Sequence, residues 1–167
     1  MGPPYPARRG TQTGEWVPGN LAAVDELDRT AATRLRDVGQ RYTSNRAALV
    51  EVLAASSHPL TIPEILEARR GMPQSSVYRN LTVLEEAGLV QRVASSDEWA
   101  RFELAEDLTE HHHHQICTSC GQVRDVTLPT RVERSLDASL AEVAAANGFV
   151  LQHHRLDLVG LCQDCAN

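Results

Sequence analysis

Apolar side chains recur at helical spacing in the first part of the chain. Between residues 21 and 38 they are three or four positions apart, which places them on one face of a helix, and Gly39 is suited to end it. A second helix is expected to follow a cap within 42–44 and to end before Pro59. Residues 1–20 contain four prolines and several glycines, and are interpreted as a flexible N-terminal arm.

Two further helices are expected before the first extended segments. Thr61 and Glu64 stand three residues apart with a proline between them, a pattern that predicts a capping box and a short third helix to about Arg69. A fourth helix is predicted over 74–87, since Gly88 follows a regular apolar face. That face consists of Val77, Leu81 and Leu84.

Two segments with the composition of strands follow, at 89–93 and 99–104, and the polar stretch 94–98 between them has the length of a hairpin loop. Helices followed by a hairpin are typical of a winged helix-turn-helix, in which the helix before the hairpin enters the major groove of DNA. The polar face of the 74–87 helix carries groups that bond phosphates and base edges: Ser75, Ser76, Tyr78, Arg79 and Thr82. A solvated polar face explains the same pattern, so composition alone leaves DNA recognition open.

The remainder of the chain predicts a small α/β unit. A strand is expected at 122–126, a helix at 130–147 and a long strand at 149–160. So few strands leave sheet edges open, and pairing with a second copy of the chain would cover one of them. A homodimer is therefore expected.

All four cysteines stand in two Cys-x-x-Cys pairs, Cys117 with Cys120 and Cys162 with Cys165. The spacer lets both sulfurs of a pair face one ion, so the two pairs can hold a single zinc in tetrahedral geometry. Disulfides would need an oxidising compartment, but no secretion signal and no membrane-length apolar run is found. A single Cys-x-x-Cys would be enough for a redox motif, so a second pair at the opposite end of the same domain fits a closed metal site better. We interpret the cysteines as a structural zinc site in a cytoplasmic protein without a membrane partner.

Histidines cluster around the first cysteine pair. Four occupy 111–114, and alternate side chains of an extended segment point the same way. His112 and His114 can therefore serve one site, and His111 and His113 another. Such imidazole sites, completed by carboxylates, suit exchangeable Fe(II), Zn(II), Mn(II) or Ni(II).

Each further candidate ligand has an alternative explanation. Glu103 and Glu133 are the nearest carboxylates, but Glu133 follows Thr130 by three residues and could belong to a capping box instead. His58 precedes a proline and could be an exposed loop residue. Of the neighbours His153 and His154, one could point into the unit and one out of it.

Charge is unevenly distributed along the chain. The formal net charge is −6, which by itself argues against nucleic acid as a partner. Residues 1–104, however, carry 12 arginines against 13 acidic residues, whereas residues 105–167 carry 4 against 9. The first part can present a basic face, and the second attracts cations. All 16 basic residues are arginine, which suits phosphate contacts but which a codon bias would also produce.

Catalytic signatures are missing from the sequence. It contains no His-Glu-x-x-His motif of a zinc hydrolase, no glycine-rich phosphate loop and no nucleophile elbow. We therefore expect neither an enzyme nor a small organic substrate. A redox sensor and a metal-storage or adaptor protein remain as alternatives.

In combination, these segments resemble the ferric uptake regulator family of bacterial metal-responsive repressors. The matching pieces lie between Arg41 and Cys165, and comprise 73–81 (PQSSVYRNL), 101–104 (RFEL), 111–121 and the closing cysteine pair. The resemblance implies an α+β protein with zinc on the four cysteines. Its parts would be a winged-helix DNA-binding domain (21–104), a hinge (105–110) and a small α/β dimerisation and metal-binding domain (111–167).

The resemblance also implies two further metal sites and a DNA surface. The regulatory site at the hinge would consist of His58, Glu103, His112 and His114. The other site would consist of His111, His113, Glu133 and His154. Arg41 resembles the family's basic minor-groove residue, while Tyr78 and Arg79 match its major-groove contacts.

The implied function is metal-dependent repression of metal homeostasis genes, by a homodimer on a palindromic operator in double-stranded DNA. Zinc-sensing members often carry cysteine where this chain has Glu103, and peroxide-sensing members typically have aspartates in place of Glu103 and Glu133. Fe(II) is therefore the expected effector. A zinc-responsive uptake regulator and a peroxide sensor of the same family are the alternatives, and Mn(II) is a further candidate ion. The segment that connects His58 to the third helix is one residue longer than is usual in the family.

Overall fold

The computed structural model of the chain describes residues 21–93 and 99–166. The expected arm (1–20) and the expected hairpin loop (94–98) lie outside these residues. Within the described ranges, no helix is long and apolar enough to cross a membrane.

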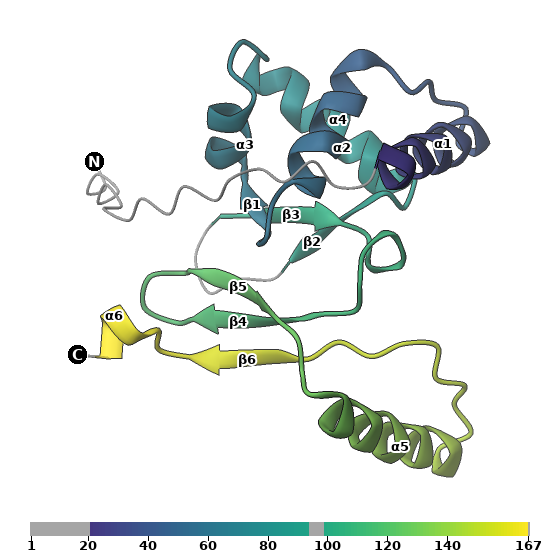
Figure 1. Cartoon of the computed structure of the whole chain (residues 1–167), viewed down its shortest axis with the longest axis vertical. Helices are drawn as coiled ribbons and strands as arrows, with labels where there is room; N and C mark the ends of the chain where they lie inside the picture. Colours follow the sequence, from purple (N-terminus) through teal and green to yellow (C-terminus); the bar gives the residue numbers. More distant parts are fainter. Residues whose placement is uncertain (1–20, 94–98, 167) are drawn as a thin grey trace.

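Helices and a small sheet form the first unit, with α1 to α4 gathered on one side of the sheet (Figure 1). The strands run antiparallel in the order β1-β3-β2, and Val93 lies opposite Arg101 in the hairpin of a winged helix. All four predicted helices and both hairpin strands are confirmed to within about two residues, whereas the short strand β1 was missed. The elements are α1 (Leu21–Asp37), α2 (Ser44–Ala54), β1 (Leu60–Thr61), α3 (Ile62–Ala68), α4 (Gln74–Glu86), β2 (Val90–Val93) and β3 (Arg101–Leu104).

The core of this unit lies between the helices and the sheet. The predicted apolar face of α4 is fully buried there, against residues of α2, α3 and β3. Burying side chains of this size stabilises the unit by about 1.5–3 kcal/mol each. The largest of them are Leu35, Leu49, Val50, Ile65, Val77, Leu81, Leu84 and Leu89.

The second unit is a three-stranded sheet with a separate helix beyond one end (Figure 1). The strand order is β5-β4-β6, with β4 antiparallel to β5 and parallel to β6. A short 3-10 turn, η1 (Glu106–Leu108), lies in the linker from the first unit. The remaining elements are β4 (His113–Cys117), β5 (Val123–Val126), α5 (Thr130–Ala146), β6 (Asp157–Gly160) and α6 (Gln163–Ala166).

The long strand expected over 149–160 is wrong. Only Asp157–Gly160 is a strand, because β6 pairs with β4 from the His114–Asp157 position onward and, in the described chain, no residue before Asp157 pairs with a strand. Phe149 and Val150 are instead exposed. Alternating apolar residues favour an extended backbone, but a strand needs a partner for its hydrogen bonds.

The predicted capping box at the start of α3 is confirmed. Thr61 Oγ1 accepts a hydrogen bond from the backbone of Glu64, whose carboxylate accepts from the backbone N–H of Thr61 at 2.8 Å. We expect Thr61→Ala to lower the free energy of unfolding by about 1 kcal/mol, measured by urea denaturation. Thr43→Ala is the matched control, because Thr43 precedes α2 but makes no capping hydrogen bond through its side chain. Equal losses in the two variants would contradict this role of the box.

Candidate metal centres

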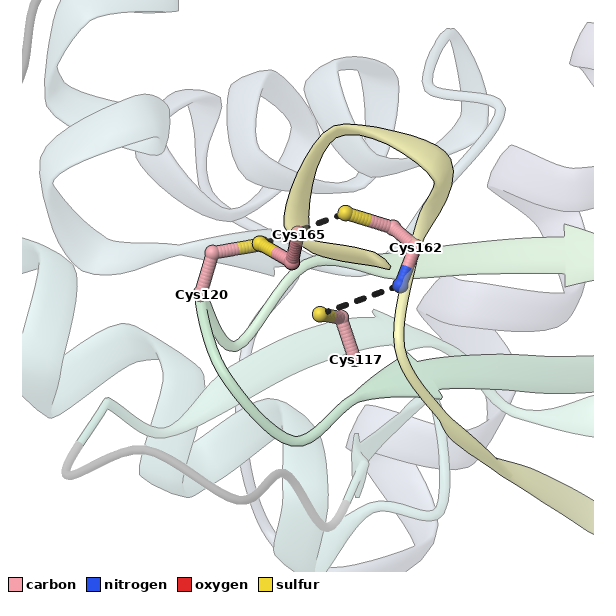
Figure 2. Close-up of side chains that lie close together, drawn as sticks. All are labelled: Cys117, Cys120, Cys162 and Cys165. Atoms are coloured by element: carbon pink, nitrogen blue, oxygen red, sulfur yellow. Dashed lines mark hydrogen bonds between the residues drawn. The ribbon is translucent and has the colours of Figure 1, made fainter. Parts of the chain in front are cut away.

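The four cysteine sulfurs meet at one end of the second sheet, where Figure 2 shows the two pairs facing each other. Strand pairing brings them together, since Cys117 ends β4 opposite Gly160 and Cys162 lies two positions after Gly160, the last residue of β6. All four sulfurs lie within 4.8 Å of one another, and the sulfurs of Cys120 and Cys162 are 3.8 Å apart. Zinc–sulfur bonds of about 2.3 Å in a tetrahedron place sulfurs about 3.8 Å apart, so this donor set fits zinc.

The charge state of the thiols also fits a cation. Backbone N–H groups of Cys120 and Cys162 lower the pKa of Cys117 to about 6, which makes it a thiolate at neutral pH. A hydrogen bond from Ser119 favours the thiolate of Cys165, but the neighbouring thiols outweigh it and raise the pKa of Cys165 to about 12. Four thiolates cannot coexist at this distance without a positive charge among them. None of the four cysteines forms a disulfide.

A second cluster lies where the two units meet, and we call it the hinge cluster. It contains Glu103 from β3, His112 just before β4, His114 from β4 and Asp125 from β5, all offering ligand atoms within 4.8 Å of one another. Glu103 Oε2 lies 3.0 Å from Nε2 of His114 and 3.4 Å from Nε2 of His112. Its members therefore come from both units, and Glu103 is buried at the contact.

The hinge cluster differs in one member from the set expected from the sequence. Asp125, which sequence reasoning missed, lies directly opposite His114 in the β4–β5 ladder and so reaches the same point. His58 does not belong to this tight group. It lines a cavity of about 300 Å³ together with Glu103, His112 and Asp125, at the edge of the cluster.

The two carboxylates of the hinge cluster, Glu103 and Asp125, repel each other. Burial alone would raise the pKa of Glu103, but the hydrogen bond and charge of His114 outweigh it and hold that pKa below its usual range. Burial raises the pKa of Asp125, and the charge of Glu103 raises it further. Glu103 is buried, whereas Asp125 is exposed. Two carboxylates this close repel each other, and both become stable as anions when a cation lies between them.

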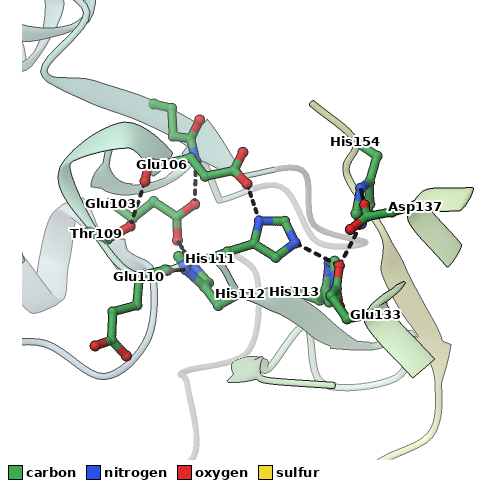
Figure 3. Close-up of polar contacts among 11 residues, drawn as sticks. Glu103, Glu106, Thr109, Glu110, His111, His112, His113, Glu133, Asp137 and His154 are labelled. Atoms are coloured by element: carbon green, nitrogen blue, oxygen red, sulfur yellow. Dashed lines mark hydrogen bonds and ion pairs between the residues drawn. The ribbon is translucent and has the colours of Figure 1, made fainter. Parts of the chain in front are cut away.

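A third cluster, which we call the Glu133 cluster, forms beside the hinge. Nε2 atoms of His111, His113 and His154 each lie 3.1 Å from a carboxylate oxygen of Glu133, near the start of α5 (Figure 3). His113 is almost completely buried on β4, and His154 precedes β6. His153 is exposed, so of the two neighbouring histidines one points in and one points out.

Outer partners set the orientation of these rings. Nδ1 of His111 lies 2.5 Å from Glu106, and Nδ1 of His154 lies 3.2 Å from Asp137. When Nδ1 carries the proton toward such a carboxylate, Nε2 presents a lone pair to the cluster centre. Nε2 of His154 is buried and makes no hydrogen bond in the described part of the chain, although it faces Glu133. A lone pair aimed at a carboxylate is unfavourable unless a cation lies between them, and the set therefore fits a divalent metal.

The hinge cluster has the same outer arrangement. Nδ1 of His112 lies 2.9 Å from the carbonyl oxygen of Glu110, and Nδ1 of His114 lies 3.4 Å from Asp157. Sequence reasoning missed both outer partners. Asp157 lies on β6 and reaches His114 only in the folded chain, whereas the Glu110 contact is a backbone carbonyl that no residue type reveals.

The capping-box explanation of Glu133 is wrong. Pro129 rather than Thr130 precedes α5 as its cap residue, and no side chain caps the helix. The carboxylate of Glu133 faces the histidines instead.

The residues expected to contact DNA lie on the surface of the first unit. Ser75, Tyr78 and Arg79 are exposed on α4, and Ser76 is partly buried beside them; Arg41 is exposed before α2. Arg46 joins these two regions. It donates to the carbonyl oxygen of Arg41 at 2.5 Å and to Asn80 of α4 at 3.2 Å.

Comparison with known proteins gives a consistent result. The family model described as the ferric uptake regulator family matches residues 37–159. The peroxide operon regulator of Bacillus subtilis is 36% identical over 149 residues, which cover 86% of this chain and 96% of that protein. The ferric uptake regulation protein of Campylobacter jejuni is 34% identical over 140 residues, covering 80% and 84%. The solved structure of the Helicobacter pylori ferric uptake regulator aligns with a TM-score of 0.70 at 25% identity, covering 86% of this chain and 94% of that one.

A winged helix, a small sheet unit and, among the described residues, three groups of side chains that could hold metal ions together define the class of metal-responsive transcription regulators. The chain belongs to the ferric uptake regulator family. It is thus a metal-binding, DNA-binding regulator of transcription.

Proposed function

We propose that this protein is an Fe(II)-responsive repressor of metal homeostasis genes, with the hinge cluster as its sensor. One observation carries the proposal. Glu103 lies on a strand of the winged helix, whereas His112, His114 and Asp125 lie in the second unit, and all four converge on one point. An ion bound there would connect the two units.

The mechanism follows from the charges of these residues. With no cation, Glu103 and Asp125 repel each other across the contact and favour separation of the units. A bound divalent ion supplies the positive charge that removes this repulsion. Glu103 then holds the winged helix at one angle to the second unit. A differential affinity of a few kcal/mol is enough to change the population from mostly open to mostly closed.

Dimerisation converts this angle into DNA affinity. Regulators of this family are dimers that bind DNA. In a dimer the hinge angle sets the spacing of the two α4 helices. Two DNA half-sites one helical turn apart are separated by about 34 Å, and the two helices must match that spacing to bind both. β6 is an edge strand, and the second unit exposes apolar side chains that a partner would cover: Val132, Val143, Phe149, Val150, Leu158, Val159 and Leu161.

On DNA, α4 would lie in the major groove. Tyr78 and Arg79 are its exposed side chains suited to bases and phosphates, with Ser75 and Ser76 at the start of the helix, and Arg41 would reach the adjacent minor groove. A palindromic operator matches the symmetry of a dimer, and its occupation would block a promoter. Such a regulator works in the cytoplasm, where the thiols remain reduced.

The donor atoms support different ions at different centres. Four thiolates suit a permanent zinc, whereas imidazole and carboxylate suit an exchangeable ion such as Fe(II), Zn(II) or Mn(II). The Helicobacter pylori protein is described as having three functional metal-binding sites, the number of clusters found in the described part of this chain. We assign Fe(II) to the hinge cluster because Glu103 stands in it instead of a cysteine.

The proposal is tested by anaerobic fluorescence anisotropy of the zinc-loaded protein on its own promoter DNA. Fe(II), Zn(II) and Mn(II) are buffered separately across their cellular ranges. We expect DNA binding that requires added Fe(II) at its cellular concentration. Tight binding indifferent to metal would refute the sensor, and a response to Zn(II) alone would make the protein a zinc regulator. Release from DNA by micromolar peroxide, with oxidation of His112 or His58 in the mass spectrum, would identify a peroxide sensor.

A further inference from the structure

The turn η1 in the linker is held from both sides by charged contacts. On one side, Glu106 Oε1 lies 2.5 Å from Nδ1 of His111, whose Nε2 faces Glu133 (Figure 3). On the other side, Asp107 forms an ion pair with Arg34 of α1. Two adjacent residues therefore connect the Glu133 cluster to the DNA-binding unit.

Arg34 extends this connection to the end of α4. Its Nη1 donates to the carbonyl oxygen of Gly88 at 2.6 Å, and the same nitrogen lies 3.3 Å from Asp107. Gly88 ends α4 with a positive φ of 65°, a conformation that favours glycine. The amides of Gly88 and Leu89 bond back to Glu85 and Leu84. One guanidinium thus bridges the linker turn and the last turn of the helix expected to read DNA.

Neighbouring contacts attach the turn to the same place. The amide of Ala105 donates to the carbonyl oxygen of Leu89 at 2.9 Å, and Leu108 packs on the core of the first unit. The hydrogen bond from Arg34 lowers the pKa of Asp107, which keeps the carboxylate charged. The Arg34–Asp107 ion pair is partly exposed, so it adds little to the free energy of folding, and its effect is to hold the linker turn in place.

We propose that Glu106, Asp107 and Arg34 form a relay through which the Glu133 cluster controls the end of α4. Glu106 and Arg34 are positioning residues: the first orients His111, and the second fixes Gly88. An ion on Nε2 of His111 would make its Nδ1–H a stronger donor to Glu106 and so order the turn. The inference rests on the proposed function in one respect, namely that α4 contacts DNA.

Hydrogen–deuterium exchange without DNA tests the relay. The zinc-loaded full chain with His112→Ala, which removes one hinge ligand, is compared with and without Mn(II). We expect Mn(II) to slow exchange at least about threefold in peptides covering 85–92 and 104–110. When Asp107→Asn is added to the His112→Ala chain, Mn(II) should no longer slow exchange at 85–92. It should still slow exchange within 111–154. Glu110→Gln is the matched control, since this linker carboxylate points away from the cluster (Figure 3).

A second variant tests the other half of the relay. Glu106→Gln should weaken Mn(II) binding by roughly tenfold, the usual effect of losing an outer carboxylate, whereas Asp107→Asn should leave that affinity unchanged. Undiminished slowing at 85–92 in Asp107→Asn, or no slowing there in the parent with Mn(II) bound, would overturn the relay. The same comparison is made in the chain that retains His112, as a control for misfolding of the His112→Ala chain. Failure of metal-dependent DNA binding would refute the proposed function but would not alter these exchange rates.

Discussion

Serine in place of Cys120 is expected to abolish zinc binding and unfold the second unit. The sheet of that unit is small, and among the described residues its own buried cluster consists of Ile116 and Val123 with Val93. Structural zinc contributes on the order of 10 kcal/mol or more in small domains, far more than so few apolar side chains supply. With three thiolates left, the chain should also lose its dimer.

The measurement combines zinc stoichiometry, light scattering after size exclusion, and circular dichroism. Asp164→Asn is the matched control, because Asp164 is exposed between the two cysteines of the second pair and is not one of the four sulfur donors. It should retain one tightly bound zinc per chain and the dimer. A zinc-free Cys120→Ser protein that remains a folded dimer would show that the four sulfurs do not hold the unit together.

Alanine in place of Glu103 is expected to remove the metal response while leaving the structural zinc in place. Glu103 is the member of the hinge cluster that the winged helix supplies, and its carboxylate contacts both His112 and His114. Without it the remaining members all belong to the second unit, so an ion bound there no longer fixes the angle between the units. We expect the increase in DNA affinity caused by Fe(II) to fall about 100-fold, equivalent to about 2.7 kcal/mol.

Anaerobic anisotropy with and without Fe(II) measures this effect, while zinc content and dimer mass report on the fold. Glu110→Ala is the control, because it removes a nearby exposed carboxylate that is not among the hinge residues. Glu103→Gln separates charge from packing, since the amide keeps the size of the side chain. Fe(II)-dependent binding at wild-type strength in Glu103→Ala would place the sensor elsewhere.

Local patterns in the sequence were sufficient for much of the fold. Helical spacing predicted α1 and α4 because each buries apolar residues that lie three or four positions apart. The Thr61–Glu64 capping box, which predicted α3, was recognisable because it depends on four consecutive residues. Alternation along 111–114 separated the histidines into the two groups that the structure shows, with His113 and His114 as consecutive residues of β4 in different groups.

What the sequence left open depends on contacts between distant residues. Asp125 joins the hinge cluster through the register of β4 against β5, and no pattern around Asp125 predicts that register. The expected strand before Asp157 is missing for the same kind of reason, because β4 offers a partner only from that point. Glu106, Asp137 and Asp157 contact ring nitrogens from three separate elements, and their role became visible only in the folded chain.

β4 has a consequence for the order in which the protein matures. Within five residues this strand presents His113 to the Glu133 cluster, His114 to the hinge cluster and Cys117 to the sulfur group. The four cysteines lie at one end of its parallel pairing with β6. We therefore expect a newly made chain to assemble both histidine groups only after a metal ion has bound to the four sulfurs. The supply of that ion would then decide whether a chain can respond to its regulatory metal, and a chain made without it is expected not to respond at all.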